Sequence, residues 1–218
     1  RDAQESRGLG DVYKRQTINV GLRNLENPSW GGWGGRYVKV RENTYLDPVP
    51  VEGYQYPEGR WYGENGWGRC SLRPGSTATE EERRIYFKPM WRWSKAMQND
   101  FAARADWCVK SYEEANHAPV VVLAHEADLM ASAGETLELS AEGTSDPDGD
   151  ELAYNWWQYV EAGSYKGKID LRNSSDVKSF IQIPDDARTG DTIHVICEVS
   201  DNGEPQLTRY QRVVITVR

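Results

Sequence analysis

The sequence lacks any long apolar run and any paired cysteine motif. No stretch approaches the ~20 apolar residues that a membrane-spanning helix needs, so we expect no membrane insertion. The three cysteines, Cys70, Cys108 and Cys197, form no C-x-x-C pair, which argues against a zinc knuckle or a thioredoxin-type site. Their odd number leaves at least one thiol unpaired, and the local patterns predict that Cys108 and Cys197 are buried as small apolar residues.

Phenylalanine is also scarce, whereas the other aromatic residues are abundant: three Phe stand against nine Trp and twelve Tyr. Trp and Tyr combine an apolar ring with a hydrogen-bonding group, which suits both cores and binding surfaces. The net charge of −8 is unevenly spread, because residues 1–117 carry 18 basic and 16 acidic side chains and residues 118–218 carry 8 and 18. This acidic second half argues against nucleic acid and anionic membranes as partners, and the shift supports a domain boundary near residue 118.

The N-terminal part of the chain shows little periodicity. Residues 1–16 have no apolar pattern, so we expect them to be a disordered tail that is unrelated to the fold. The chain has no initiating Met, and we expect it to be the C-terminal part of a larger protein. Residues 17–80 are dense in Gly and Pro, which favours loops and short strands. Because these residues also include many Trp and Tyr, we predict an ordered, loop-rich surface rather than a linker.

Two further regions have a clear period. Apolar residues spaced four or seven apart from Trp93 to Tyr112 predict an amphipathic helix over about residues 89–115. Beyond Pro119 the pattern changes to short strands separated by turn clusters, which is typical of an all-β sandwich over residues 118–218. The predicted strands are 119–124, 135–141, 151–159, 178–183, 191–200 and 207–217.

Several aromatic residues are candidate sugar-binding platforms, because the C–H face of a sugar ring stacks on an indole. Four of them lie among glycines: Trp30, Trp33, Trp61 and Trp67. The alternative is that they pack against the rest of their own domain. Trp156 and Trp157 are consecutive in a predicted strand and must face opposite sides of a sheet, so one is core and the other is free to join Tyr159 and Tyr165 in a second sugar-binding strip.

The sequence D-P-D-G-D places Asp146, Asp148 and Asp150 around a Gly turn. Alternating carboxylates of this kind suit calcium, an oxygen-seeking cation. It is not an EF-hand, since Trp157 stands where that motif has Glu. The alternative is an Asp-Gly turn in which the side chains cap their own backbone.

The three histidines lack the spacing of a metal site, and no nucleophile motif accompanies them. We therefore assign no catalytic residue. His194 lies in a predicted strand, where a hydrogen-bonded structural role is expected.

Five ordered strings carry a family resemblance: WGGWGGRY at 30–37, WRWSKAMQNDFAARADWCV at 91–109, EANHAP at 114–119, GTSDPDGDELAYNWWQYVEAGSY at 143–165 and IHVICEVSDNG at 193–203. They resemble bacterial cellulose-binding proteins that have a nucleoside-hydrolase-like domain followed by a C-terminal immunoglobulin-like domain. The resemblance spans about residues 17–218.

The resemblance implies that residues 17–117 are the end of an α/β domain and that residues 118–218 form an immunoglobulin-like sandwich. It also implies a secreted or periplasmic protein whose partner is cellulose or a related plant glycan. Nucleoside hydrolases take a late calcium ligand from an Asp that follows a His. Asp100 matches that Asp, but Asn99 replaces the His, and a structural salt bridge is the alternative for Asp100.

Three functions remain open at this point. The first is a carbohydrate-binding protein. The second is a hydrolase of glycosidic or N-ribosyl bonds, whose catalytic Asp cluster would lie upstream because no such cluster precedes residue 100. The third makes the sandwich a spacer that holds the α/β domain at a surface.

Overall fold

The computed structural model describes residues 20–42, 44–46, 88–89 and 91–218. The N-terminal tail 1–16 and the candidate platforms Trp61 and Trp67 lie outside these residues. The elements are η1 (Pro28–Trp30), β1 (Val38–Arg41), β2 (Thr44–Leu46), α4 (Ser94–Asp106), η2 (Tyr112–Glu114), β3 (Asp128–Ala131), β4 (Thr136–Ser140), β5 (Ala153–Gln158), β6 (Asp170–Arg172), β7 (Lys178–Gln182), β8 (Thr192–Ser200) and β9 (Thr208–Val217). The protein is therefore mostly β-sheet with one α-helix in the described part.

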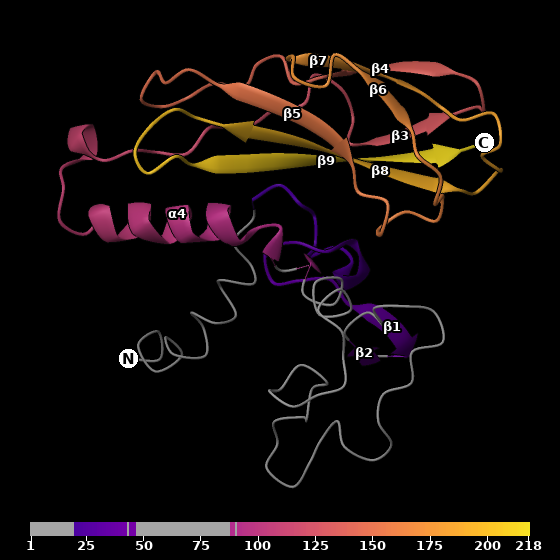
Figure 1. The fold of residues 1–218 in the computed structure, drawn as a ribbon, viewed down its shortest axis with the longest axis horizontal. Helices are drawn as coiled ribbons and strands as arrows, with labels where there is room; N and C mark the ends of the chain where they lie inside the picture. Colours follow the sequence, from indigo (N-terminus) through magenta and orange to yellow (C-terminus); the bar gives the residue numbers. More distant parts are fainter. Residues whose placement is uncertain (1–19, 43, 47–87, 90) are drawn as a thin grey trace, which may run out of the picture.

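Two sheets face one another across the main core (Figure 1). The larger has the strand order β3-β9-β8-β5, and the smaller has the order β4-β7-β6. All pairings are antiparallel except β3 with β9. Strands β1 and β2 form a separate small hairpin.

The core between the sheets is made of alternate residues from both. Strand β8 contributes Val195 and Cys197, and β5 contributes Trp156, which is 2% exposed. Leu139 of β4 and Ile181 of β7 face them from the other sheet. Alternation with period two places these side chains on the inner faces, as the sequence predicted.

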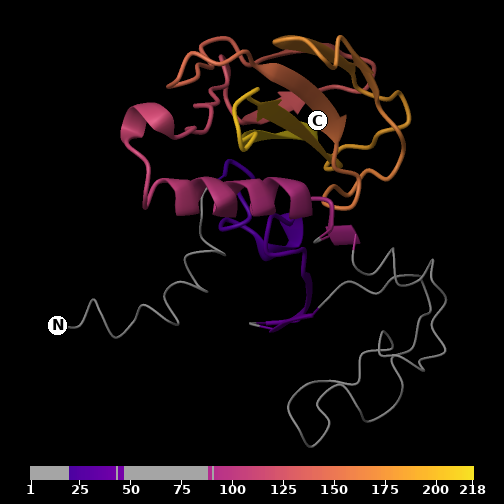
Figure 2. The ribbon, with the colours of Figure 1, turned by 60° about the vertical axis from the view of Figure 1, so that its left-hand side comes forward.

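The outer face of the four-stranded sheet is also covered. Segment 20–37 and helix α4 lie along this face in both ribbon views (Figures 1 and 2). Here Ile196 and Tyr210 pack with Val20, Leu22 and Trp93 in a second apolar cluster. Because both faces are buried, β8 has a nearly unbroken run of buried residues.

Glycine allows segment 20–37 to approach the sheet closely. The amide of Tyr210 donates to the Val20 carbonyl at 2.8 Å, and the next residue, Gly21, has a φ of +92°. A Cβ at Gly21 would overlap the Tyr210 carbonyl oxygen. No other residue type fits this position, where a left-handed backbone runs against strand β9.

Arg212 of β9 is the main polar link between this segment and the sheet. It is 0% exposed, and its Nε donates to the Leu22 carbonyl at 2.7 Å. Its Nη2 donates to the carbonyls of Trp30 and Gly31, both at 2.9 Å. Its Nη1 donates to His194 Nδ1 at 3.0 Å, and burial followed by the Arg212 charge lowers the pKa of His194 to about 3. His194 is thus a neutral hydrogen-bond acceptor, in keeping with its expected structural role.

The helix is shorter than the predicted 89–115. Helix α4 ends at Asp106, and Ser111 and Glu114 then form a capping box that starts the separate turn η2. Trp93 is buried, but the rest of the predicted apolar stripe on the helix does not face the sheet: Phe101 is 60% exposed, and Asp100 and Ala103 are the buried residues of α4. Cys108 follows the helix and is exposed, which corrects the prediction that it is buried, whereas Cys197 is buried as predicted.

Five predicted strands correspond to β4, β5, β7, β8 and β9. The remaining predicted strand, 119–124, is not a strand in the structure, where Val120 forms only an isolated bridge with Ser145. Strands β3 and β6 are short and were not predicted. Within the described residues, no helix has the length and apolar content to cross a membrane.

We predict that Arg212→Met lowers the free energy of unfolding by about 3 kcal/mol, because three buried carbonyls lose their donor. Urea denaturation measures this change. The mutation should also expose segment 20–37 to trypsin, which cleaves after Arg23 and Arg36. Arg218→Met, at a residue whose side chain is 60% exposed, is the control and should change neither property. Equal protease resistance in both variants would contradict the role given to Arg212.

Candidate functional site

The two tryptophans of β5 lie on opposite faces of the sheet, as predicted. Trp156 is the core residue, and its Nε1 donates to the Asp176 carbonyl at 3.0 Å. Trp157 is half-buried on the outer face, where its ring is 5.8 Å from that of Trp93 between centroids. Of the two rings, Trp157 is the one available to a ligand.

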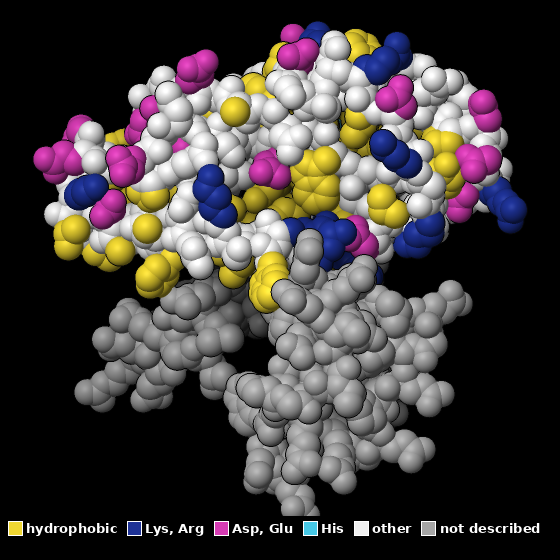
Figure 3. All heavy atoms as spheres, viewed as in Figure 1, with side chains coloured by type: hydrophobic (Ala, Val, Ile, Leu, Met, Phe, Trp, Pro, Cys, Tyr) yellow, Lys and Arg dark blue, Asp and Glu magenta, His cyan; other side chains and the backbone are white. Residues whose placement is uncertain are grey.

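Trp157 lines a cavity of about 590 Å³, a size in the usual range for ligand sites. Its walls come from the residues just before and at the start of α4, from the end of β5 with the loop that follows, and from β8. They are Lys88, Arg92, Trp93, Trp157, Gln158, Val160, Glu161 and Glu198. We call this cavity the Trp157 pocket. On the face drawn in Figure 3, hydrophobic side chains gather in a hollow near the start of α4, with basic and acidic side chains at its border.

Glu198 holds the Trp157 ring in place. The indole Nε1 of Trp157 donates to Glu198 Oε2 at 3.1 Å. Burial raises the pKa of Glu198, an effect that the hydrogen bond from Trp157 partly offsets. No Lys or Arg among the described residues forms an ion pair with Glu198, so burial of its charge is not compensated.

The pocket also contains an ion-pair network. Arg92 Nη2 and Lys88 Nζ both contact Glu161 Oε1, at 2.6 and 3.1 Å. Burial raises the pKa of Glu161, but Arg92 and Lys88 outweigh it, and the net shift is downward. The Arg92 guanidinium also lies over aromatic rings, 4.4 Å from the Tyr159 centroid and 5.5 Å from that of Trp157. The pocket therefore offers an indole, donors and acceptors together.

Two predicted sugar platforms are buried, which corrects their assignment. Trp33 is 7% exposed and Tyr159 is 1% exposed, and both belong to the apolar cluster on the outer face of the sheet. A buried ring has no face free for a sugar. Tyr165 donates its hydroxyl to Asp186 at 2.8 Å and is not among the pocket residues, so the predicted strip reduces to Trp157.

Trp30 is partly exposed, but cations cover its ring. The guanidinium carbons of Arg23 and Arg212 lie 5.0 and 5.8 Å from the ring centroid, and His194 meets the ring edge-on. Arg23 is held there by ion pairs with Glu26 and Asp128. Two guanidinium groups and His194 thus contact the Trp30 ring, which favours the packing alternative for Trp30. Trp157 also has one guanidinium, that of Arg92, over its ring, but it lines a cavity.

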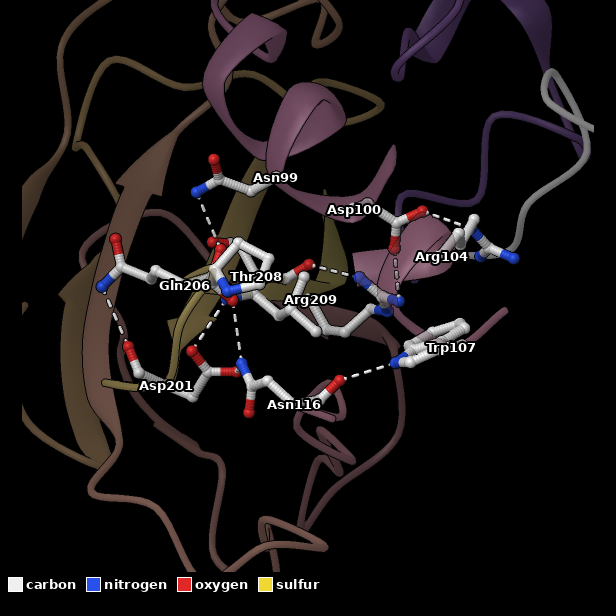
Figure 4. Close-up of polar contacts among 11 residues, drawn as sticks. Asn99, Asp100, Arg104, Trp107, Asn116, Asp201, Gln206, Thr208 and Arg209 are labelled. Atoms are coloured by element: carbon white, nitrogen blue, oxygen red, sulfur yellow. Dashed lines mark hydrogen bonds and ion pairs between the residues drawn. The ribbon is translucent and has the colours of Figure 1, made fainter. Parts of the chain in front are cut away.

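Asp100 forms the structural salt bridge that the sequence left open as an alternative (Figure 4). Its side chain is 3% exposed, and its two oxygens contact Arg104 Nε at 2.6 Å and Arg209 Nη2 at 2.7 Å. Asn99 next to it donates to the Gln206 carbonyl at 2.8 Å. With a cationic partner on each oxygen, Asp100 links α4 to β9 and has no free oxygen for a metal ion.

The structure brings Asp146, Asp148 and Asp150 together, with one oxygen from each within 4.8 Å of the others. Asp146 Oδ1 accepts from the backbone amides of Asp148 and Asp150 at 2.8 and 3.3 Å, as expected for a side-chain-capped turn. Asp146 Oδ2 is buried and has no hydrogen-bond partner. Both oxygens of Asp148 contact His117: Oδ1 lies 3.0 Å from the ring Nδ1, and Oδ2 accepts from the backbone amide at 2.6 Å. The geometry thus contains the capped turn and also an oxygen cluster.

Sequence reasoning missed the polar half of the Trp157 pocket: Lys88, Arg92, Glu161 and Glu198. One signal was available, because Glu198 is a charged residue in the otherwise apolar strand sequence IHVICEV. Arg92 and Glu161 gave no such signal, since their pairing depends on how the residues before α4 lie over the sheet.

Comparison with known proteins agrees with the fold. Residues 136–217, from the first residue of β4 to the last of β9, match the family described as cellulose-binding protein Sde0182, C-terminal domain. No curated protein matches the chain. The family resemblance is thereby confirmed for residues 136–217, which match this family of C-terminal domains.

Among solved structures, the chain is similar to a nucleoside hydrolase-related hypothetical protein from Saccharophagus degradans that is associated with carbohydrate metabolism. The identity is 34% and the TM-score 0.65, over 92% of this chain and 45% of that one. The chain thus spans less than half of that structure's length. A PKD domain from the KIAA 1837 protein has 14% identity and a TM-score of 0.33, over 45% of this chain and 86% of that domain.

The raised pKa of Glu198 predicts a pH-dependent effect of Glu198→Gln on stability. The folded state binds the Glu198 proton more tightly than the unfolded state, so this group makes folding less favourable as pH rises. Gln keeps an acceptor for Trp157 without the charge. The variant should melt above the unmodified protein at about pH 7, and the difference should shrink toward about pH 4. Thermal melts across this range test it, with Glu151→Gln at an exposed site as control; a difference independent of pH would contradict the assignment.

Proposed function

We propose that this protein binds polysaccharide, cellulose or a related plant glycan, through the Trp157 pocket. The observation that carries the proposal is that the Trp157 ring lines one cavity together with the acceptor Glu198 and the paired groups Arg92 and Glu161. A sugar ring laid on the indole would have hydroxyl groups near both walls. The family described as cellulose-binding protein supports the same ligand class.

Two features favour binding at this place over the spacer function. Polar groups on both walls surround an apolar ring in one concave site, as is usual for ligand pockets. In addition, Trp157, Glu161 and Glu198 lie within the residues that match the family, whereas Lys88 and Arg92 come from the preceding segment. The complete site therefore requires both parts of the chain.

We also propose the finer assignments that the resemblance suggests. The two packed sheets of residues 118–218 are in keeping with an immunoglobulin-like sandwich. The likeness to a nucleoside hydrolase-related structure supports residues 17–117 as the end of an α/β domain. A protein of this kind would act in the periplasm or outside the cell, where its polysaccharide is found.

We further propose that the turn at residues 146–150 binds calcium. Its three carboxylates lie close together, and Asp146 Oδ2 has no hydrogen-bond partner. Burial, and after it the charges of Asp146 and Asp148, raise the pKa of Asp150, so the three carboxylates are close enough to repel one another. Calcium accepts six to eight oxygens in flexible geometry, so backbone carbonyls and water would complete the shell.

Trp157→Ala should weaken binding of the full chain to microcrystalline cellulose by about tenfold or more, since a central aromatic contact is lost. Depletion from solution over a range of cellulose concentrations measures this. Phe101→Ala is the matched control, because Phe101 is 60% exposed on α4 and lies outside the pocket. Thermal melts of both variants check that they fold. If Phe101→Ala loses binding and Trp157→Ala does not, the polysaccharide binds on α4 and the assigned pocket is wrong.

Calcium should raise the melting temperature, and a chelator should reverse the rise. At about ten times its Kd, calcium would add about 1.4 kcal/mol to the free energy of unfolding. Asp150→Asn removes one ligand oxygen charge and should abolish the response, whereas Asp170→Asn at an exposed residue of β6 should retain it. Identical melts of the unmodified protein in calcium and in chelator would rule out the site.

A further inference from the structure

We propose that the Trp157 pocket prefers acidic glycans: a uronic acid unit stacks on the Trp157 ring, and its carboxylate pairs with Lys88 beside Arg92. This inference rests on the proposed function, because it concerns the same pocket. It adds the chemical class of the sugar and the side chains that select it.

The first observation is an excess of positive charge beside the Trp157 ring. Lys88 Nζ and Arg92 Nη2 lie 3.1 and 2.6 Å from the same oxygen of Glu161, so two cations share one carboxylate. The guanidinium carbon of Arg92 is 5.5 Å from the Trp157 ring centroid, which brings this charge close to any sugar that stacks on the ring. A carboxylate on that sugar would neutralise the excess charge.

Lys88 is the cation that a ligand can reach most readily. Its side chain is 60% exposed, whereas that of Arg92 is 15% exposed and lies over the Tyr159 ring at 4.4 Å. The Lys88 ammonium can turn toward a ligand carboxylate and leave the pair between Arg92 and Glu161 intact. The charges would then pair one to one, with Lys88 on the ligand and Arg92 on Glu161.

The second observation is that the unpaired buried atoms of the pocket are donors. Arg92 Nε and Trp93 Nε1 are buried and have no hydrogen-bond partner. Among the described residues that line the pocket, no buried side-chain acceptor lacks a partner. A buried donor without an acceptor is costly, and a carboxylate brings two acceptor oxygens in one group. The pocket therefore needs acceptors more than it needs donors.

Cations outside the pocket lining strengthen the positive field at this end of β5. Tyr159 follows β5, and burial raises the pKa of its hydroxyl. The charges of three arginines, Arg92, Arg212 and Arg36, act in the opposite direction. In the part of the chain that the structure describes, Glu161 is the acid whose charge offsets theirs at Tyr159. A ligand carboxylate in the pocket would lie in this field.

Glu198, which lines the same pocket, does not exclude a ligand carboxylate. Its Oε2 accepts from Trp157 Nε1 at 3.1 Å. Burial already raises the pKa of Glu198, and a second carboxylate nearby would raise it further and favour the protonated form. That form still accepts from Trp157 and gains a hydroxyl that can donate to the ligand. Glu198 can thus change from a competitor of the ligand carboxylate to its hydrogen-bond donor.

Two matched probes test the proposal: cellohexaose and a β-1,4-linked glucuronic acid hexasaccharide, which differs in carrying a carboxylate at C6 of each unit. Isothermal titration of the full chain at low salt should show about tenfold tighter binding of the acidic probe. Added salt should weaken binding of the acidic probe and leave that of cellohexaose unchanged. Lys88→Gln removes the excess charge without breaking the pair between Arg92 and Glu161, and it should abolish the preference.

Control variants separate failure of this inference from failure of the proposed function. Lys110→Gln removes an exposed lysine that pairs with Asp106 outside the pocket, and it should change neither affinity. If Trp157→Ala leaves binding of both probes unchanged, the pocket is not the binding site and the proposed function fails there. If Trp157→Ala abolishes binding but cellohexaose binds the unmodified protein as tightly as the acidic probe, the pocket stands and the inference is wrong. A full acidic preference in Lys88→Gln would equally overturn it.

Discussion

The arrangement of this protein depends on a buried guanidinium that pairs with no carboxylate among the described residues. Arg212 is held by the carbonyls of Leu22, Trp30 and Gly31 and by neutral His194. Burial lowers the pKa of Arg212 only to about 10, so the group remains charged at neutral pH. Its desolvation is offset because four dipoles converge on it. This interaction fixes segment 20–37 on the outer face of the four-stranded sheet.

The Trp157 pocket follows from that covering of the sheet. With one face of the sheet on the main core and the other under segment 20–37 and α4, the outer residues of β5 and β8 are largely enclosed. The covering stops near the start of α4, where Trp93 packs on Trp157 and Arg92 reaches Glu161. Further along the helix, Asp100 pairs with Arg209 of β9 and links the helix to the sheet. The Trp157 pocket thus lies at the edge of the interface between the four-stranded sheet and the segments that cover it.

The sequence was most informative where a local period reflects burial. Alternation located β4, β5, β7, β8 and β9 to within a few residues and separated Trp156 from Trp157. It failed for α4, because the face toward the sheet is chosen by the ion pairs of Asp100 and by small Ala103 rather than by apolar content. The polar residues of the pocket were not predictable, since Arg92 and Glu161 are 69 positions apart and meet only after docking. Whether the Asp146 turn holds a cation depends on chemistry that spacing alone does not determine.

The hydrogen bond between Trp157 and Glu198 determines which part of the indole remains available to a ligand. The single polar atom of the indole is already engaged by Glu198, so the ring can offer a ligand only its apolar face. Stacking on such a face depends on shape and hardly distinguishes one hydroxyl arrangement from another. In the proposed binding mode, affinity and selectivity would therefore rest on different side chains. A homologous domain could keep the tryptophan and acquire a new glycan preference by changing the acidic and basic residues around it.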